Sequence, residues 1–220
     1  MTYDEYGDAE YDFVEASLKD RSEEAVQVYL GRFGDAIDER VMSILKTSEE
    51  LLESGFIEQA LTASCTSIEI MIRFMVVRPL VQGAFLSEEW SEILTDRIGS
   101  GRADADRKLF PRLLQEWGID INDFQINNNE LLWDYIHKEM IPTRNKVVHA
   151  GMTITEDQSE KAVSAAKVFR NTVIKAIEKR FGFTLETTGC WCRSSYEEGS
   201  VSDGTYKKGS AYFVAESPFE

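Results

Sequence analysis

The sequence has few of the residue types that build metal centres and disulfide frameworks. It contains three cysteines and two histidines among 220 residues. The cysteines form neither an even set nor two spaced pairs, which argues against a disulfide-stapled domain and a conventional zinc site. We therefore expect reduced thiols in a cytoplasmic protein that uses no metal and no cofactor.

The sequence also lacks a signal peptide, a long uninterrupted hydrophobic run and the common hydrolase motifs. Its first residues have no basic region followed by an apolar one, so export by that route is not expected. The most apolar stretch, 65–86, is interrupted by Glu69, Arg73, Arg78 and Pro79. These interruptions indicate a core helix and no membrane span. No glycine-rich phosphate loop, zinc-protease helix or nucleophile elbow occurs.

Negative charge is concentrated in the first part of the chain. The net charge is −15, and residues 1–60 contain sixteen Asp or Glu against five Lys or Arg. Residues 140–180 have the opposite balance, with eight basic residues against four acidic ones. An acidic protein binds a polyanion only through a local positive patch, so residues 140–180 are the candidate nucleic-acid surface. The acidic part is a solvated face or, alternatively, an arm that covers a basic cleft.

Apolar residues recur at three- and four-residue steps through most of the chain, which predicts amphipathic helices. We expect these helices over residues 36–53, 57–77, 87–98, 105–117, 130–140 and 156–181. An asparagine of the run 127–129 is expected to cap the fifth helix. The short connection near Gly55 predicts that the first two helices pack antiparallel.

These patterns predict an all-α helical bundle with two extensions. Residues 1–34 are expected to form an acidic N-terminal arm or short helix, because they are rich in acids and poor in aliphatic residues. Residues 35–182 form the predicted helical domain. Residues 183–220 are β-branched, aromatic and rich in Gly and Ser, so a small β hairpin or a partly ordered tail is expected there, with 183–187 and 211–214 as candidate strands.

Arg144 and His149 are separated by four residues in the segment 139–151, Glu-Met-Ile-Pro-Thr-Arg-Asn-Lys-Val-Val-His-Ala-Gly. This segment resembles the R-x4-6-H signature of the HEPN superfamily of ribonucleases, including the Asn that often follows the Arg. The resemblance covers approximately residues 36–182 as a helical frame, and its specificity comes from this motif. It implies a HEPN-like bundle, metal-independent cleavage of RNA, and a homodimer that brings two motifs into one cleft.

The two motif residues match the two demands of RNA cleavage without a metal. Histidine has a reference pKa of about 6.5, so it can move a proton at the 2′-hydroxyl or the leaving oxygen near neutrality. Arginine stays charged and offers a bidentate fork to phosphate oxygens. Residues 144 and 149 would point about 140° apart in an unbroken helix. We therefore expect the helix to bend or end between them, with Pro142 and Gly151 as the causes.

Four further site residues are assigned on the same resemblance. Asn145 is a supporting residue that orients the phosphate or holds the turn, and Lys146 is an RNA contact. Glu69 supports the site as acidic residues do in some families of the superfamily, and Arg73, one turn later, contacts RNA. Gly151 stands where a toxin subgroup has a tyrosine two residues after the histidine, so regulation through such a tyrosine is not expected.

The resemblance predicts an endoribonuclease of phage defence or of a toxin–antitoxin system, with an antitoxin or defence-system protein as its partner. The alternative is a non-catalytic HEPN-like module that binds a nucleotide, nucleic acid or protein. In that case Arg144 pairs with an acid and His149 interacts with the last carbonyls of the helix. A third hypothesis is an acidic inhibitor that mimics nucleic acid, because the net charge is −15.

Two minor features have alternative interpretations. His137 lies beside Lys138 and Glu139, where a solvated surface position is expected and a second proton carrier is the alternative. Cys190 and Cys192 place two thiols on one side of a strand as half of a metal site. Ordinary thiols are favoured because no further Cys or His lies nearby to complete four ligands.

Overall fold

The computed structural model describes residues 3–79, 110–111, 114–115, 118–126, 130–181, 183–185, 191–193 and 219. These residues are mostly helical, as the sequence predicts. The helix expected over 87–98, the strand expected over 211–214 and the asparagines 127–129 lie outside the described residues. Of the helix expected over 105–117, residues 110, 111, 114 and 115 are described and are helical.

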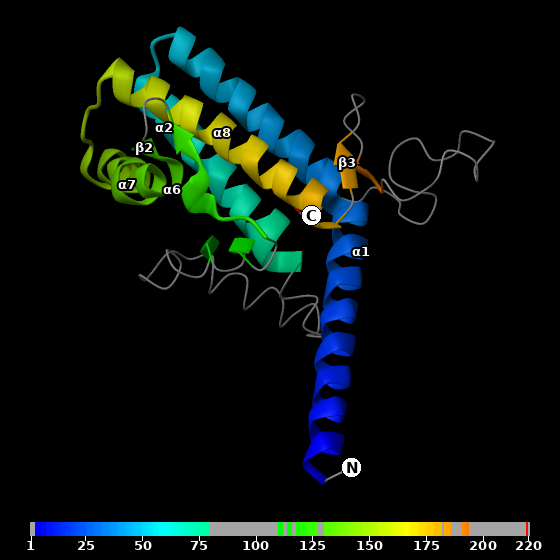
Figure 1. The fold of residues 1–220 in the computed structure, drawn as a ribbon. Helices are drawn as coiled ribbons and strands as arrows, with labels where there is room; N and C mark the ends of the chain where they lie inside the picture. Colours follow the sequence, from blue (N-terminus) through cyan, green and yellow to red (C-terminus); the bar gives the residue numbers. More distant parts are fainter. Residues whose placement is uncertain are drawn as a thin grey trace, which may run out of the picture.

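Three long helices form the body of the molecule: α1 (Tyr3–Glu53), α2 (Ile57–Ile70) and α8 (Glu156–Phe181) (Figure 1). A three-residue turn joins α1 to α2, and its Gly55 has a positive φ of 80°. The first two helices therefore form the predicted antiparallel hairpin, against which α8 packs. The core between them consists of buried apolar side chains such as Ile37, Leu61 and Phe169.

A largely buried ion pair joins α8 to α1 at the margin of this core. Arg170 donates from Nε to Asp38 Oδ1 at 2.8 Å and from Nη2 to Oδ2 at 2.6 Å. The Asp38 side chain is only 7% exposed and that of Arg170 14%. Two charges removed this far from water are tolerated because each satisfies the other in bidentate geometry.

The domain boundary expected at residues 34 and 35 falls inside α1, which continues through it without a break. Val26, Tyr29 and Leu30 are buried in the core, so the helical body begins no later than Val26. Residues 3–25 continue the same helix and extend beyond the other two long helices (Figure 1). The acidic arm therefore leads away from the segment 141–150 and does not fold over it.

The chain between α2 and α8 carries the motif. A π-helical segment, η1 (Met71–Val77), continues α2, and further on η2 (Ile121–Asp123) precedes a two-stranded ladder of β1 (Gln125–Ile126) and β2 (Glu130–Leu131). The ladder leads into α6 (Leu132–Tyr135), the π-helical η3 (Ile136–Met140) and α7 (Ile141–Ala150).

The helix predicted from residue 130 begins two residues later than expected. Glu130 and Leu131 pair with β1, and Leu131 is the extended N-cap of α6 without a side-chain cap. The predicted asparagine cap is therefore wrong, because strand pairing takes up the residues that would have formed the first helical turn.

The predicted beginning of α8 at Glu156 is confirmed, and it follows from the neighbouring residues. Thr155 and Gln158 form a reciprocal capping box, in which each side chain accepts from the backbone N–H of the other residue. After α8, β3 (Phe183–Leu185) pairs antiparallel with β4 (Trp191–Arg193). A two-stranded ladder is thus present in the region where a small hairpin was expected, but residues 191–193, and not a strand named from the sequence, pair with β3. Cys192 lies in β4, whereas Cys190 is outside the described residues.

Among the described residues, one helical stretch, Ile57–Val77, is long and apolar enough to cross a membrane by length and composition. It comprises α2 and η1. In the structure, 56% of its most apolar window is buried inside the fold, where α2 packs against α1 and α8. This burial accords with the core helix predicted from its charged residues.

Candidate functional site

The motif helix α7 follows a widened turn. In η3 the N–H of Ile141 donates to the carbonyl of Ile136, five residues earlier. Pro142 has no N–H, and its ring would clash with a carbonyl one normal turn before it. The π-helical turn provides the room that the proline ring needs. Such turns are rare and are often found at functional sites.

α7 itself is a regular helix that contains both Arg144 and His149. The predicted bend between these residues is wrong, because the distortion lies before Pro142 and the helix ends after His149. It ends at Gly151, which has φ 65° and ψ 27°, a left-handed conformation that favours glycine. The two motif side chains consequently leave the helix about 140° apart and about 7.5 Å apart along its axis. Arg144 is paired with Glu69 of α2, whereas His149 is exposed.

Arg144 is directed toward α2, where it forms an ion pair between its Nη2 and Oε1 of Glu69. Its Nη1 donates to Asn145 Oδ1 at 3.1 Å. The Arg144 side chain is 20% exposed and that of Glu69 47%. The structure thus brings together three of the predicted site residues, and it shows that Asn145 and Glu69 hold the guanidinium from two sides.

Cys65 also lies beside Arg144. It is buried on α2, with its Sγ 4.0 Å from the carbonyl oxygen of Met140 at the start of α7. Burial raises the pKa of the Cys65 thiol to about 11, although the nearby Arg144 acts in the opposite direction. The thiol therefore stays protonated near neutrality and is a packing group, not a nucleophile.

The contact between Cys65 and Arg144 was not predicted from the sequence. A signal existed, because Cys65 precedes Glu69 by four residues on α2 and positions i and i+4 lie on the same face of a helix. Any residue that approaches Glu69 from another element therefore also approaches Cys65.

His149 lies on the exposed side of α7. Asn145, Lys146, Val148 and His149 are all exposed, and no residue of this helix is fully buried. Val148 is 53% exposed, which is high for a branched apolar side chain. His149 is also in the last turn of the helix.

The remaining predicted positions are less closely connected to Arg144. Arg73 lies in η1, with its guanidinium carbon 5.3 Å from the centre of the Phe74 ring. His137 is not the solvated surface residue that was expected. It is half-buried and packs edge-to-face on Trp133, with ring centres 3.9 Å apart. This packing favours a structural role over a second proton carrier.

Half of the eight cations in the predicted basic surface over residues 140–180 are paired with acids from other elements. Four of its cations form ion pairs: Arg144 with Glu69, Lys161 with Glu130 and Glu139, Lys167 with Glu49, and Arg170 with Asp38. Lys146, Lys175 and Lys179 are exposed and make no ion pair with the described residues. Of these three, only Lys146 lies on the motif helix.

Among the described residues, no group of three or more His, Cys, Asp or Glu could hold a metal ion. Comparison with known proteins finds no matching family model, no matching curated protein and no matching solved structure. A functional assignment for this chain consequently depends on its motif and on the geometry around Arg144.

Proposed function

We propose that the chain is a metal-independent endoribonuclease of the HEPN type, acting in the cytoplasm in phage defence or in a toxin–antitoxin system. The observation that carries this proposal is the fixed position of the motif arginine. Glu69 and Asn145 hold Arg144 in one orientation, while His149 on the same helix is open to solvent. A preorganised cation and an accessible proton carrier are the two groups that the reaction requires.

The proposed active site is composed of two copies of the chain. Arg144 and His149 diverge on α7, so one copy cannot present both side chains to the same phosphate. The exposed face of α7 includes the apolar Val148, which a second copy can cover. Two α7 helices that face each other across a twofold axis bring His149 of one copy toward Arg144 of the other.

In this site the 2′-hydroxyl of RNA attacks the adjacent phosphorus and the 5′-oxygen of the next nucleotide leaves. The products are a 2′,3′-cyclic phosphate and a 5′-hydroxyl, so no water is consumed in the step. His149 transfers a proton at the attacking or leaving oxygen, and Arg144 stabilises the charge that builds on the phosphate. Lys146 contacts the RNA backbone beside them.

The test is an RNA-cleavage assay of the purified chain in the presence of EDTA. We expect the wild type to cleave RNA, and both Arg144→Ala and His149→Ala to lose at least a hundredfold in rate. Lys46→Ala is the matched control, because Lys46 is an exposed cation of α1 outside both the motif and the candidate nucleic-acid surface. A wild-type protein that is folded and dimeric, with any cognate partner removed, and that leaves RNA intact contradicts the proposal.

A second candidate function is a non-catalytic helical module that binds a nucleotide, nucleic acid or protein. The observation that favours it is that Arg144 already has an acidic partner within its own chain, as a structural arginine would. This alternative predicts that His149→Gln preserves all biological activity. The ribonuclease proposal predicts that the same substitution abolishes activity, because glutamine cannot transfer the proton.

A further inference from the structure

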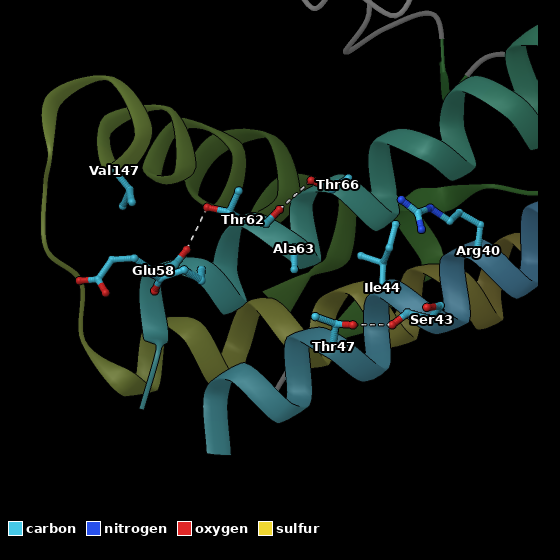
Figure 2. A pocket seen from close by; sticks show the side chains of 10 residues that line it. Arg40, Ser43, Ile44, Thr47, Glu58, Thr62, Ala63, Thr66 and Val147 are labelled. Carbon is cyan, nitrogen blue, oxygen red and sulfur yellow. Dashed lines mark hydrogen bonds between the residues drawn. The ribbon is translucent and has the colours of Figure 1, made fainter. Parts of the chain in front are cut away.

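A groove runs between α1 and α2 and is closed at one side by α7 (Figure 2). It has a volume of about 560 Å³. Arg40 and Thr66 lie at one end, and Thr47 and Glu58 lie at the other. Among the described residues, four of α1, five of α2 and Val147 of α7 line the groove.

The walls of the groove fit an α-helix better than an extended chain. Within the part of the chain that the structure describes, no strand borders the groove, so a bound extended segment would find no row of backbone partners there, whereas a helix satisfies its own backbone. The hydroxyls of three threonines that line the groove, Thr47, Thr62 and Thr66, already donate hydrogen bonds to carbonyl oxygens of their own helices, at 2.9 to 3.0 Å. Arg40 and Thr47 are seven residues apart, which corresponds to about 10.5 Å, or two helical turns.

The charges at the two ends of the groove define a polarity. Arg40 is the cation at one end and Glu58 the carboxylate at the other. An α-helix has a partial positive charge at its N-terminus and a partial negative charge at its C-terminus. A helix with its N-terminus at Glu58 and its C-terminus at Arg40 therefore matches both ends. Such a helix runs parallel to α2 and antiparallel to α1.

The same charges disfavour nucleic acid as the occupant. One cation is balanced by one carboxylate, so the groove has no net positive charge with which to attract a polyanion. The apolar side chains of Ile44, Ala63 and Val147 instead offer a surface for the nonpolar face of an amphipathic helix.

We propose that this groove binds a two-turn amphipathic helix of a partner protein, with its basic N-terminal end at Glu58 and its acidic C-terminal end at Arg40. Val147 lies on α7 between Arg144 and His149, so the bound helix touches the motif helix itself. The partner thereby gains a direct route to control the position of α7. The docking does not depend on RNA cleavage, and its test is independent of that activity.

The experiment is a display selection of helix-constrained 14-residue peptides on the full chain, with counter-selection on Ala63→Arg, which fills the middle of the groove. We expect enriched peptides to share an apolar stripe, basic residues near the N-terminus and acidic residues near the C-terminus. The best peptide, measured by fluorescence anisotropy, should lose at least tenfold in affinity for Ala63→Arg. Met42→Arg is the control, because Met42 is exposed on α1 outside the groove.

The direction of the bound helix is tested by exchanging the charges of Arg40 and Glu58 at the two ends of the groove. In the double variant Arg40→Glu with Glu58→Arg, a peptide whose terminal charges are also exchanged should bind about fivefold more tightly than the original peptide, as two exposed ion pairs allow. Circular dichroism and thermal unfolding verify that each variant is folded. If Ala63→Arg does not fold, Ser43→Arg, at an exposed position of the same groove, replaces it.

Several results overturn the proposal. They are the absence of an enriched peptide family, equal binding to wild type and groove variants, and a preference that ignores the charge exchange. A wild-type dimer that becomes monomeric in the groove variants shows that a second copy occupies the groove. Displacement of the peptide by an RNA oligonucleotide at equal concentration shows that the groove belongs to the nucleic-acid surface.

Discussion

The proposed two-copy active site predicts that two inactive variants restore each other. Arg144→Ala removes the cation from both sites of its homodimer, and His149→Ala removes the proton carrier from both. Random exchange of equal amounts gives heterodimers as half of all dimers. In each heterodimer one site combines the intact Arg144 of one chain with the intact His149 of the other, whereas the second site lacks both. The mixture should therefore recover about a quarter of the wild-type rate per chain.

This recovery can be measured with a fluorophore- and quencher-labelled RNA after the subunits have exchanged. Subunit exchange is verified separately by energy transfer between labelled chains. The matched control mixes Arg144→Ala with the double variant Arg144→Ala/His149→Ala, whose heterodimers contain no intact site. If exchange is complete and the test mixture remains as inactive as this control, each site draws both residues from one chain and the geometric reasoning is refuted.

Three other predictions concern individual contacts. Glu69→Gln should lower the cleavage rate roughly tenfold at unchanged KM, because a neutral amide orients Arg144 less firmly; a faster enzyme would show that Glu69 restrains the arginine. Asp38→Ala should cost roughly 3 kcal/mol in urea unfolding, because it leaves Arg170 without its partner. Glu49→Ala, which breaks the more exposed pair with Lys167, should lower the free energy of unfolding by under about 1 kcal/mol. Equal losses in the Asp38 and Glu49 variants would contradict the argument that burial makes the Asp38–Arg170 pair the more important one. Gly151→Ala should cost about 1 kcal/mol in the same assay, because alanine disfavours the left-handed conformation; an unchanged unfolding midpoint would contradict this.

Helix ends that depend on local chemistry could be predicted from the sequence. Gly55 follows the end of α1 and has a positive φ, and Thr155 caps the beginning of α8 in a capping box. Both features are properties of a few neighbouring residues. The continuity of α1 could not be predicted in this way. The burial of Val26, Tyr29 and Leu30 depends on packing against distant elements, which the composition of residues 1–34 does not reveal.

The site shows the same division between local and distant causes. Pro142 requires a distortion, but its ring can be accommodated either by a bend in α7 or by a wider turn before it, and local rules do not choose between them. The structure has the wider turn, with Cys65 against the carbonyl of Met140. The Arg144–Glu69 pair joins residues 75 positions apart, so the role of Glu69 could be suggested by the resemblance whereas its contact could not.

The long acidic extension of α1 has an electrostatic consequence. Residues 3–25 contain nine Asp or Glu against two Lys or Arg, which is nearly half of the net charge of −15. These 23 residues form about 35 Å of helix that leads away from α7 (Figure 1). The Debye length at physiological ionic strength is about 8 Å, so most of this charge is screened before it reaches the motif. If α7 binds RNA as proposed, the acidity of the chain opposes that binding chiefly in dilute buffer, and added salt should first strengthen the binding before it weakens it.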